Sequence, residues 1–357
     1  MKTAVFYGKE DVRIEERQKP VPGEGQLVVK IGYAGLCGTD VDAYRTGSFL
    51  KTGMALGHEN VGTVVEVGPG TTGFAVGDRI ICGPPSYCEP PCPSCRRGDP
   101  NICYNALPAT RGIGGPDGGY AEYMLVDDVR RNTLVKLPDN LDFKDAVLYD
   151  VVCVGIHAIR LSRFRFGDNV VVSGGGGPVG LSTVRLLKAA GARRLAVLQR
   201  GVKKAGILAE MGAGLVIDPD TEPDISGAIR GFFGTGELAD VSFECAGTKE
   251  SLFNCLEYAT RPGGQVMMVG QVTEPIGNIV PSDSFVRELD LQFSFVFTGH
   301  DIEVFLDMLT EGKLDFPGMV TDTIRLEDCV GKGLGLGREE RRGQIKILID
   351  PALREGS

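Results

Sequence analysis

The sequence predicts an α/β protein in which a domain with a doubly wound parallel sheet is inserted into a β-rich domain. Both ends of the chain show short strands between Gly- and Pro-rich turns, whereas strands and helices alternate through the middle. The length of 357 residues, 42% of them apolar, is enough for two domains with separate cores. The expected β-rich domain spans residues 1–152 and 298–357, and the expected inserted domain spans residues 153–297.

The β-rich part is predicted from short apolar segments that Pro and Gly residues interrupt. Pro22-Gly23 and Pro69-Gly70 are typical of tight turns between strands. After about residue 297 the chain returns to this pattern, with a helix and short strands. The expected segments are strands at 26–31, 62–67, 79–82 and 344–349 and a helix at 302–310.

The inserted part is predicted from compact apolar runs that alternate with helical spacing. Residues 169–173 form a β-branched run typical of a strand that is buried on both faces. Regular alternation of strand and helix indicates a parallel sheet covered by helices on both sides. The expected strands are 169–173, 195–198, 215–217, 241–244 and 265–269, and the expected helices are 180–190, 204–211 and 249–260.

The overall composition narrows the class of protein. A formal net charge of −9 argues against general nucleic-acid binding, because neutralising phosphates requires a basic surface. The chain has no run of about eighteen uninterrupted apolar residues that would predict a membrane span. Its first residues lack the apolar core of a secretory signal. We therefore expect a cytoplasmic protein that binds neither nucleic acid nor membranes.

A glycine-rich segment follows the first strand of the inserted domain and precedes a helix. Gly175, Gly177 and Gly180 match G-x-G-x-x-G, with Pro178 and Val179 between the last two glycines. The first glycine allows the tight turn, the second lets a pyrophosphate approach the backbone, and the third lets the helix pack on the strand. An ordinary Gly-rich turn is the alternative, but the strand before and the helix after favour dinucleotide binding.

The end of the second expected strand bears on which dinucleotide is bound. An acidic residue there would accept hydrogen bonds from the ribose diol of NAD(H). This chain has Gln199 and Arg200 instead, followed by Lys203 and Lys204. Such cations would attract a 2′-phosphate, so we hypothesise a preference for NADP(H). A solvated start of the next helix is the alternative interpretation of the same cations.

Four of the ten cysteines lie within sixteen residues, at Cys88, Cys92, Cys95 and Cys103. A disulfide framework is improbable in a long chain without a secretory signal. The C-x3-C-x2-C-x7-C spacing can close a tetrahedral site with no open position, which is typical of structural zinc. The alternative, a surface loop of unligated thiols, would be exposed to oxidation.

A second group of candidate metal ligands is more dispersed. Cys37 and the neighbouring pair His58 and Glu59 each follow a predicted strand or turn. Three protein ligands and an open position make a catalytic zinc site. Spacing alone supports this assignment weakly. His157 and His300 are expected to be structural, since neither has a partner at ligand spacing.

Together these segments resemble the zinc-containing medium-chain dehydrogenase/reductase family, particularly its polyol, threonine and secondary-alcohol branches. The resemblance extends over nearly the whole chain. The segments that carry it are Cys37-Gly-Thr-Asp40, Gly57-His-Glu-Asn-Val-Gly62, Val76-Gly-Asp-Arg-Ile80, the cysteine loop, Gly119-Tyr-Ala-Glu-Tyr123, Gly155-Ile-His-Ala158, the glycine turn and Arg261-Pro-Gly-Gly264.

The resemblance implies a GroES-like domain that holds the metals and a Rossmann domain that holds the cofactor. It implies that Cys37 and His58 are catalytic zinc ligands. Asp150 corresponds to a third ligand or near-ligand, and Glu59 to a position that is a direct ligand only in some branches. Thr39 corresponds to the hydroxyl that starts the proton relay.

Further implications concern the cofactor, the assembly and three departures from the family pattern. Lys204 corresponds to a basic residue near the adenosine ribose, and a homodimer or homotetramer is implied. Asp42 stands where the family often has a relay histidine, so the relay uses a carboxylate or another route. Val151 replaces a frequent Pro after Asp150. The first pair of loop cysteines is separated by one additional residue, and Cys82 is a less suitable substitute ligand.

The implied reaction is hydride transfer between an alcohol and a nicotinamide, with zinc as the Lewis acid that stabilises the alkoxide. The expected substrate is a small-molecule secondary alcohol or its carbonyl, of the polyol, sugar or cyclitol kind. One alternative is a zinc-independent NADPH reductase of activated double bonds, which shares the fold. Another is a non-catalytic protein that retains fold and cofactor. The retained candidate ligands argue against both.

Overall fold

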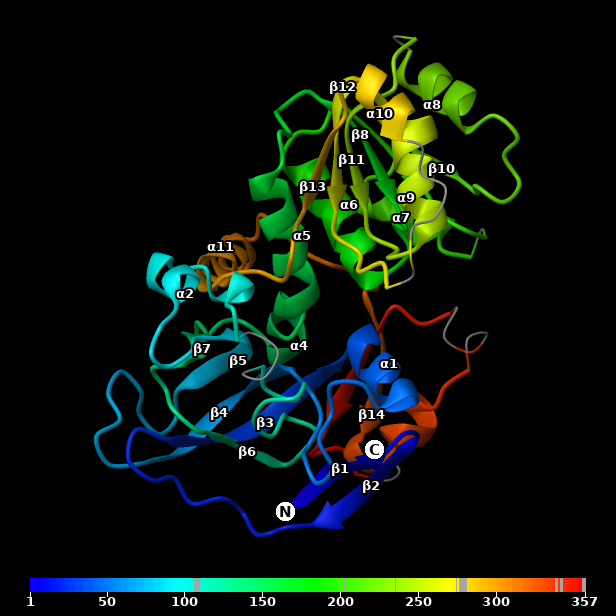
Figure 1. The fold of residues 1–357 in the computed structure, drawn as a ribbon. Coiled ribbons are helices and arrows are strands. Elements are labelled where there is room, and N and C mark those ends of the chain that lie inside the picture. Colours follow the sequence, from blue (N-terminus) through cyan, green and yellow to red (C-terminus); the bar gives the residue numbers. More distant parts are fainter. Residues whose placement is uncertain are drawn as a thin grey trace. The chain divides into compact units, whose positions relative to one another are not determined.

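The computed structural model describes residues 1–105, 110–201, 203–234, 236–273, 275, 281–337, 340 and 343–354. The chain divides into two compact units (Figure 1). The first consists of Met1–Asp150, Val296–Gly312 and Val320–Ser357, and the second of Val151–Phe295 and Lys313–Met319. The chain passes from one unit to the other after Asp150, Phe295, Gly312 and Met319. The expected domains divide after residues 152 and 297, and the segment 313–319 was expected in the β-rich domain.

The first unit is built on a seven-stranded sheet in the order β14-β15-β3-β4-β5-β7, with β6 paired to β3, and on the hairpin β1-β2. Its helices include α1 (Gly38–Thr46), α2 (Pro93–Arg97), α4 (Phe143–Ala146) and α11 (Gly299–Thr310). The strands are β1 (Lys2–Gly8), β2 (Asp11–Glu16), β3 (Leu27–Leu36), β4 (Glu59–Val67), β5 (Arg79–Ser86), β6 (Tyr123–Val126), β7 (Asn132–Lys136), β14 (Val320–Arg325) and β15 (Lys346–Asp350).

The C-terminal strand completes the core of this first unit. β15 runs antiparallel to β3, and Leu348 pairs with Gly35. Ile347 and Ile349 are buried in the same apolar cluster as Val29 and Ile31 of β3. Each such side chain contributes about 1.5–3 kcal/mol by leaving water. The two ends of the chain are therefore held in one domain by shared burial.

The second unit is built on a six-stranded sheet in the order β10-β9-β8-β11-β12-β13, in which every pairing is parallel. In sequence order this is 3-2-1-4-5-6, the doubly wound order of dinucleotide-binding domains. The strands are β8 (Asn169–Ser173), β9 (Arg194–Leu198), β10 (Leu215–Ile217), β11 (Ala239–Glu244), β12 (Thr260–Met268) and β13 (Asp290–Phe293). The helices are α6 (Pro178–Ala189), α7 (Ala205–Met211), α8 (Ile225–Phe233), α9 (Lys249–Asn254) and α10 (Pro281–Val286).

Several elements differ from the sequence prediction. The expected helix at 249–260 is α-helical only to Asn254, continues as a π-turn to Ala259, and leads directly into β12. Helix α5 (Tyr149–Leu161) begins at the end of the first unit and continues into the second. It was not among the predicted segments, and neither was β13, which alternates exposed and half-buried residues and so lacks a compact apolar run.

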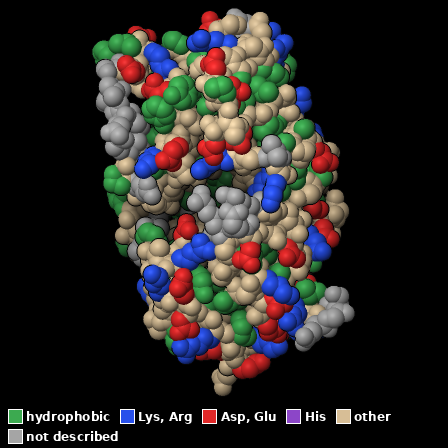
Figure 2. Space-filling model, turned by 90° about the vertical axis from the view of Figure 1, so that its right-hand side faces the viewer, with side chains coloured by type: hydrophobic (Ala, Val, Ile, Leu, Met, Phe, Trp, Pro, Cys, Tyr) green, Lys and Arg blue, Asp and Glu red, His purple; other side chains and the backbone are tan. Residues whose placement is uncertain are grey.

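No helix in the described part of the chain is long and apolar enough to cross a membrane. Acidic and basic side chains are interspersed over the face shown in Figure 2.

Candidate active site and cofactor pocket

The first candidate metal centre forms where two strands of the first unit meet. Cys37 follows β3 and precedes α1, and His58 and Glu59 lie at the start of β4. The antiparallel register of β3 and β4 pairs Gly35 with Glu59, which brings the three candidate ligands together. One donor atom from each of Cys37, His58 and Glu59 lies within 4.8 Å of the others. A thiol, an imidazole and a carboxylate in this arrangement fit zinc.

A buried carboxylate orients the histidine. Asp40 Oδ1 lies 3.1 Å from His58 Nδ1, while its Oδ2 accepts hydrogen bonds from the Tyr120 hydroxyl at 2.7 Å and the Cys37 amide at 3.1 Å. Burial favours the neutral acid, but His58 and these hydrogen bonds hold the pKa of Asp40 below its usual value. A carboxylate on Nδ1 fixes the ring so that Nε2 is the nitrogen available to a metal. The sequence analysis names Asp40 and Tyr120 only as parts of motifs and predicts no role for either residue.

A buried lysine lies against the glutamate of this centre. Lys346, from β15, forms an ion pair with Glu59 Oε2, and both side chains are almost completely buried. Burial lowers the pKa of Lys346, but the neighbouring Glu59 carboxylate raises it above its usual value. A Cβ at Gly35 would come within 1.8 Å of Glu59 Oε2, so glycine is required where the two strands pass the carboxylate. Sequence reasoning missed Lys346 because it is separated from Glu59 by most of the chain.

Asp150 lies near this centre without joining the compact set of donors. It stands in the first turn of α5 and is buried. Burial, together with the charge of Glu59, raises its pKa to about 7. Among the described residues the group of mutually close donors contains Glu59 and does not contain Asp150. The two candidate third ligands are therefore neighbours, and Glu59, not Asp150, is grouped with Cys37 and His58.

The expected proton-relay residues lie on α1. Thr39 Oγ1 is 3.6 Å from Cys37 Sγ and its side chain is exposed. Asp42 is also exposed, and its carbonyl oxygen accepts a hydrogen bond from the Thr46 hydroxyl. Thr39 thus lies beside Cys37, whereas no hydrogen bond or ion pair joins the Asp42 carboxylate to these ligands among the described residues.

The cysteine loop gathers its four sulfurs. Cys88 Sγ lies 3.7 Å from Cys95 Sγ, and Cys92 Sγ lies 3.8 Å from Cys103 Sγ. Four sulfurs at the usual Zn–S distance of about 2.3 Å in a tetrahedron are separated by about 3.8 Å. The Cys92 amide donates a hydrogen bond to Cys88 Sγ. These distances fit a closed zinc site.

The additional residue in the first cysteine spacing does not prevent this arrangement. All four sulfurs of the loop lie within 4.8 Å of one another. Cys82 is not a substitute ligand, because it lies on β5 in the apolar core, where burial raises the pKa of its thiol.

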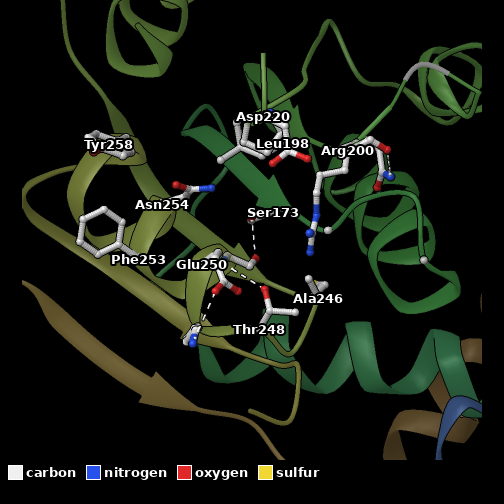
Figure 3. Close-up of a pocket in the computed structure, with 17 residues that line it drawn as sticks. Ser173, Leu198, Arg200, Asp220, Ala246, Thr248, Glu250, Phe253, Asn254 and Tyr258 are labelled. Atoms are coloured by element: carbon white, nitrogen blue, oxygen red, sulfur yellow. Dashed lines mark hydrogen bonds and ion pairs between the residues drawn. The ribbon is translucent and has the colours of Figure 1, made fainter. Parts of the chain in front are cut away.

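The second unit contains a cavity of about 730 Å³ at the carboxyl ends of its central strands. Figure 3 shows its walls: Arg200 extends into it from the end of β9, toward Ala246, and Asn254 and Tyr258 stand on the opposite side. Gly174 and Gly177 line it at the glycine turn. Ligands of open parallel sheets bind at this edge, where the order of the strands reverses.

The glycine turn has the geometry that the motif predicts. Gly177 is the N-cap of α6, Pro178 occupies the first turn, and Val179 accepts hydrogen bonds from side chains one turn later. A Cβ at Gly175 would come within 2.4 Å of Val197, and one at Gly180 within 2.3 Å of the Gly174 carbonyl oxygen. The turn and the close packing of α6 on β8 therefore require glycines.

Several residues of this cavity were missed by sequence reasoning. Asp220, which follows β10, lines the same pocket as Arg200, so a carboxylate faces the cavity although none stands at the end of β9. Phe253 and Tyr258 form an edge-to-face pair on another wall. The short β10 and the π-turn after α9 bring these residues together, and neither gives a periodic signal in the sequence.

Comparison with known proteins covers both units. The family model described as Alcohol dehydrogenase GroES-like domain matches residues 23–139, and the model described as Zinc-binding dehydrogenase matches residues 178–311. Sorbitol dehydrogenase of Homo sapiens is 31% identical, over 98% of this chain and 96% of its own length. The chain belongs to the zinc-binding alcohol dehydrogenase family.

Two further relatives of this alcohol dehydrogenase span the whole chain. The (R,R)-butanediol dehydrogenase of Bacillus subtilis is 29% identical over 98% of this chain and its full length. The crystal structure of a putative zinc-binding dehydrogenase from Sinorhizobium meliloti, bound to NADP, superposes with a TM-score of 0.86 at 30% identity, covering 98% of this chain and 99% of that one. The predicted family and the predicted GroES-like and Rossmann fold are confirmed.

Membership of the zinc-binding alcohol dehydrogenases also confirms the predicted class of reaction. The protein is an oxidoreductase that acts on CH–OH groups with zinc and a nicotinamide cofactor. The alternatives, a zinc-independent reductase of double bonds and a non-catalytic protein, are not favoured. His157 contacts Arg160 and His300 lies near Glu303, so neither lies in the candidate metal centre.

Proposed function

We propose that the chain oxidises a secondary alcohol of the polyol, sugar or cyclitol kind, or reduces the matching carbonyl, at the centre formed by Cys37, His58 and Glu59. The observation that carries the proposal is the compact set of three buried or half-buried donors, with His58 oriented by Asp40. The substrate class is supported by relatives named as butanediol and sorbitol dehydrogenases.

Each residue of the proposed centre has a separate task. Bound zinc supplies a Lewis acid that lowers the pKa of a coordinated alcohol. Asp40 keeps the His58 ring in one orientation, and Lys346 balances the charge of Glu59. Thr39, beside Cys37, accepts the proton that the substrate hydroxyl loses and passes it toward solvent, with Asp42 as the next acceptor on α1. Asp150 replaces Glu59 as third ligand if the carboxylate of Glu59 stays with Lys346.

NADP(H) is proposed as the preferred cofactor. Arg200 extends into the pocket and its side chain has no ion-pair partner among the described residues. A guanidinium in that position matches a phosphate in two hydrogen bonds. The NADP-bound relative from Sinorhizobium meliloti agrees with this choice. Asp220 works in the opposite direction, because its carboxylate would repel a 2′-phosphate.

The cytoplasmic location and the homodimer or homotetramer remain proposals as well. Support for an oligomer comes from the edge strand β13, which pairs only with β12 among the described residues. Phe293 and Phe295 on this edge are 66% and 49% exposed. An apolar edge strand is a template for pairing with a second chain.

Metal analysis and a substrate panel test the function together. Zinc per chain is measured on protein purified without added zinc, and a panel of polyols, sugars and cyclitols is then assayed with NAD and NADP. We expect about two zinc ions per chain, since each donor set can hold one. We also expect alcohol-dependent reduction of the cofactor, with a lower KM for NADP than for NAD. Protein without zinc that nevertheless reduces activated double bonds would contradict the proposal. Activity with simple primary alcohols alone would refute the substrate class but leave the zinc chemistry intact.

A further inference from the structure

The glycine run has a glycine, Gly176, at the open position between the first two glycines of its motif. In the segment 174–177 every residue is glycine, yet G-x-G-x-x-G leaves the position of Gly176 open. Two side chains from the segment after β9 bind the backbone of this residue. Gln199 Oε1 accepts a hydrogen bond from the Gly176 amide at 2.7 Å, and Lys204 Nζ donates one to the Gly176 carbonyl oxygen at 2.8 Å.

The absence of a side chain at Gly176 is what lets this contact form. A Cβ there would lie 2.4 Å from Gln199 Oε1 and 2.6 Å from Gln199 Cδ, closer than any real Cβ contact. The amide end of Gln199 would have to leave, and its hydrogen bond to the Gly176 amide with it. The additional glycine and the glutamine are therefore matched to each other.

The segment that carries Gln199 and Lys204 is itself fixed. Gln199 Nε2 donates to the Arg200 carbonyl oxygen at 2.9 Å, and Asp218 Oδ2 accepts from the Gly201 amide at 2.9 Å. Both polar ends of the Gln199 side chain are thus engaged within the protein. Lys204 is half-buried, and its ammonium group bonds to the glycine turn instead of extending into solvent.

We propose that Gln199 and Lys204 are positioning residues that clamp the Gly176 peptide and so fix the turn that receives the cofactor pyrophosphate, and that Arg200 alone discriminates the 2′-phosphate. The proposal assigns different parts of the cofactor to neighbouring residues. Loss of the clamp weakens every ligand that carries the pyrophosphate, whereas loss of Arg200 weakens only ligands that carry the 2′-phosphate. The inference rests on the cofactor pocket and refines the proposed NADP(H) preference.

Four ligands separate these effects: NADPH, NADH, ADP-ribose, which has the pyrophosphate without a 2′-phosphate, and adenosine 2′-phosphate, which has the reverse. Dissociation constants are measured for the variants Lys204→Met and Gly176→Ala. NADPH and NADH are followed by their fluorescence, and the other two ligands by competition with them. Lys188→Met is the control, because Lys188 is an exposed lysine on α6 of the same unit and does not line the cofactor pocket. Arg200→Gln reports on the 2′-phosphate.

We expect Lys204→Met and Gly176→Ala to weaken NADPH, NADH and ADP-ribose by a common factor of about ten, the size typical of one lost charge-assisted hydrogen bond. Binding of adenosine 2′-phosphate should not change, and Lys204→Arg should recover part of the loss. Arg200→Gln should weaken NADPH and adenosine 2′-phosphate and leave ADP-ribose as it was. Lys188→Met should match the unmodified protein.

Two results would overturn the clamp. One is a Lys204→Met variant that loses NADPH and adenosine 2′-phosphate selectively, since that would make Lys204 a direct 2′-phosphate ligand. The other is a Lys204→Met or Gly176→Ala variant that is folded, as judged by circular dichroism, and binds all four ligands as the unmodified protein does. A protein that prefers NADH, but whose clamp variants still lose NADH and ADP-ribose in parallel, would refute the cofactor preference and retain the clamp.

Discussion

At the scale of single residues, two charged groups of the candidate metal centre each have a defined buried partner. Asp40 contacts His58, and Lys346 contacts Glu59, in both cases away from water. A buried charge that lost its partner would be strongly destabilising, because desolvation would no longer be offset. The partners are therefore as informative about this site as the candidate ligands themselves.

Asp40→Asn is predicted to impair the centre without unfolding it. The amide retains the shape of the side chain but removes the charge that fixes His58. Loss of such a hydrogen-bond partner to a metal-bound histidine typically costs about 10–100-fold in metal affinity or activity. Zinc retention against a chelator and kcat/KM for the best alcohol measure the effect. Glu66→Gln, a surface pair with Lys19, is the control, and an Asp40→Asn protein with normal zinc affinity and turnover would contradict the assigned role.

Lys346→Met is predicted to destabilise the metal-free protein more than the zinc-loaded protein. The substitution leaves Glu59 buried without a counter-charge, and removing one partner of a buried ion pair costs about 3–5 kcal/mol. Zinc would supply a positive charge in place of the ammonium. Urea unfolding with and without a chelator measures the difference.

The double variant Glu59→Gln, Lys346→Met is the control for the buried charge. It should recover part of the lost stability because no charge then remains unpaired. Equal losses of stability in metal-free and zinc-loaded Lys346→Met would show that Glu59 does not face the metal.

At the scale of elements, strands place the ligands and loops complete the sites. The β3–β4 register brings Cys37 to Glu59, while the cysteine loop around α2 collects its own ligands over a short stretch of chain. Pro93 begins α2, and Gly98 ends it with a left-handed residue. Most side chains of this loop other than its cysteines are exposed, so we expect its order to depend on a bound metal.

Cys95→Ser is predicted to remove the zinc of the cysteine loop and leave the other centre loaded. The expected zinc content falls from about two per chain to about one, since a structural site needs all four ligands. Limited proteolysis should then cut within the loop. Cys82→Ala tests a cysteine of the same unit that lies in the core and outside the cluster, and it should retain the full zinc content. A Cys95→Ser protein that kept both zinc ions would exclude the loop as a metal site.

At the scale of the whole molecule, each of the two units has its own sheet and its own core. The first unit needs the C-terminal strand β15 both for its apolar core and for Lys346. The sheet of the second unit ends in the edge strand β13, which carries the exposed apolar side chains of Leu291 and Phe293. This edge is the surface that we propose for association with a second copy of the chain.

Phe293→Glu is predicted to shift the protein from oligomer to monomer. A charge on each copy of an apolar edge strand is a device that blocks edge-to-edge pairing. Sedimentation velocity measures the mass, and zinc content shows whether the metal sites remain. Phe166→Glu, at another exposed position in the same unit, controls for surface charge. An unchanged mass in Phe293→Glu would place the interface elsewhere or show that the chain is a monomer.

The sequence by itself determined the fold class, the cysteine loop and the glycine turn, because each depends on residues close together in the chain. Alternating strands and helices predict a parallel sheet, and four cysteines within sixteen residues can meet without long-range folding. The pairing of Cys37 with His58 needed the family resemblance, since spacing alone left it weak.

The tertiary structure decided what distant segments contribute. Lys346 reaches Glu59 through the pairing of β15 with β3, Tyr120 reaches Asp40, and Asp220 reaches the pocket of Arg200. It also groups Glu59, and not Asp150, with Cys37 and His58 among the mutually close donors of the described residues. These contacts depend on strand register and on burial. Both are set by how distant segments pack together, and not by the residues next to each side chain in the sequence.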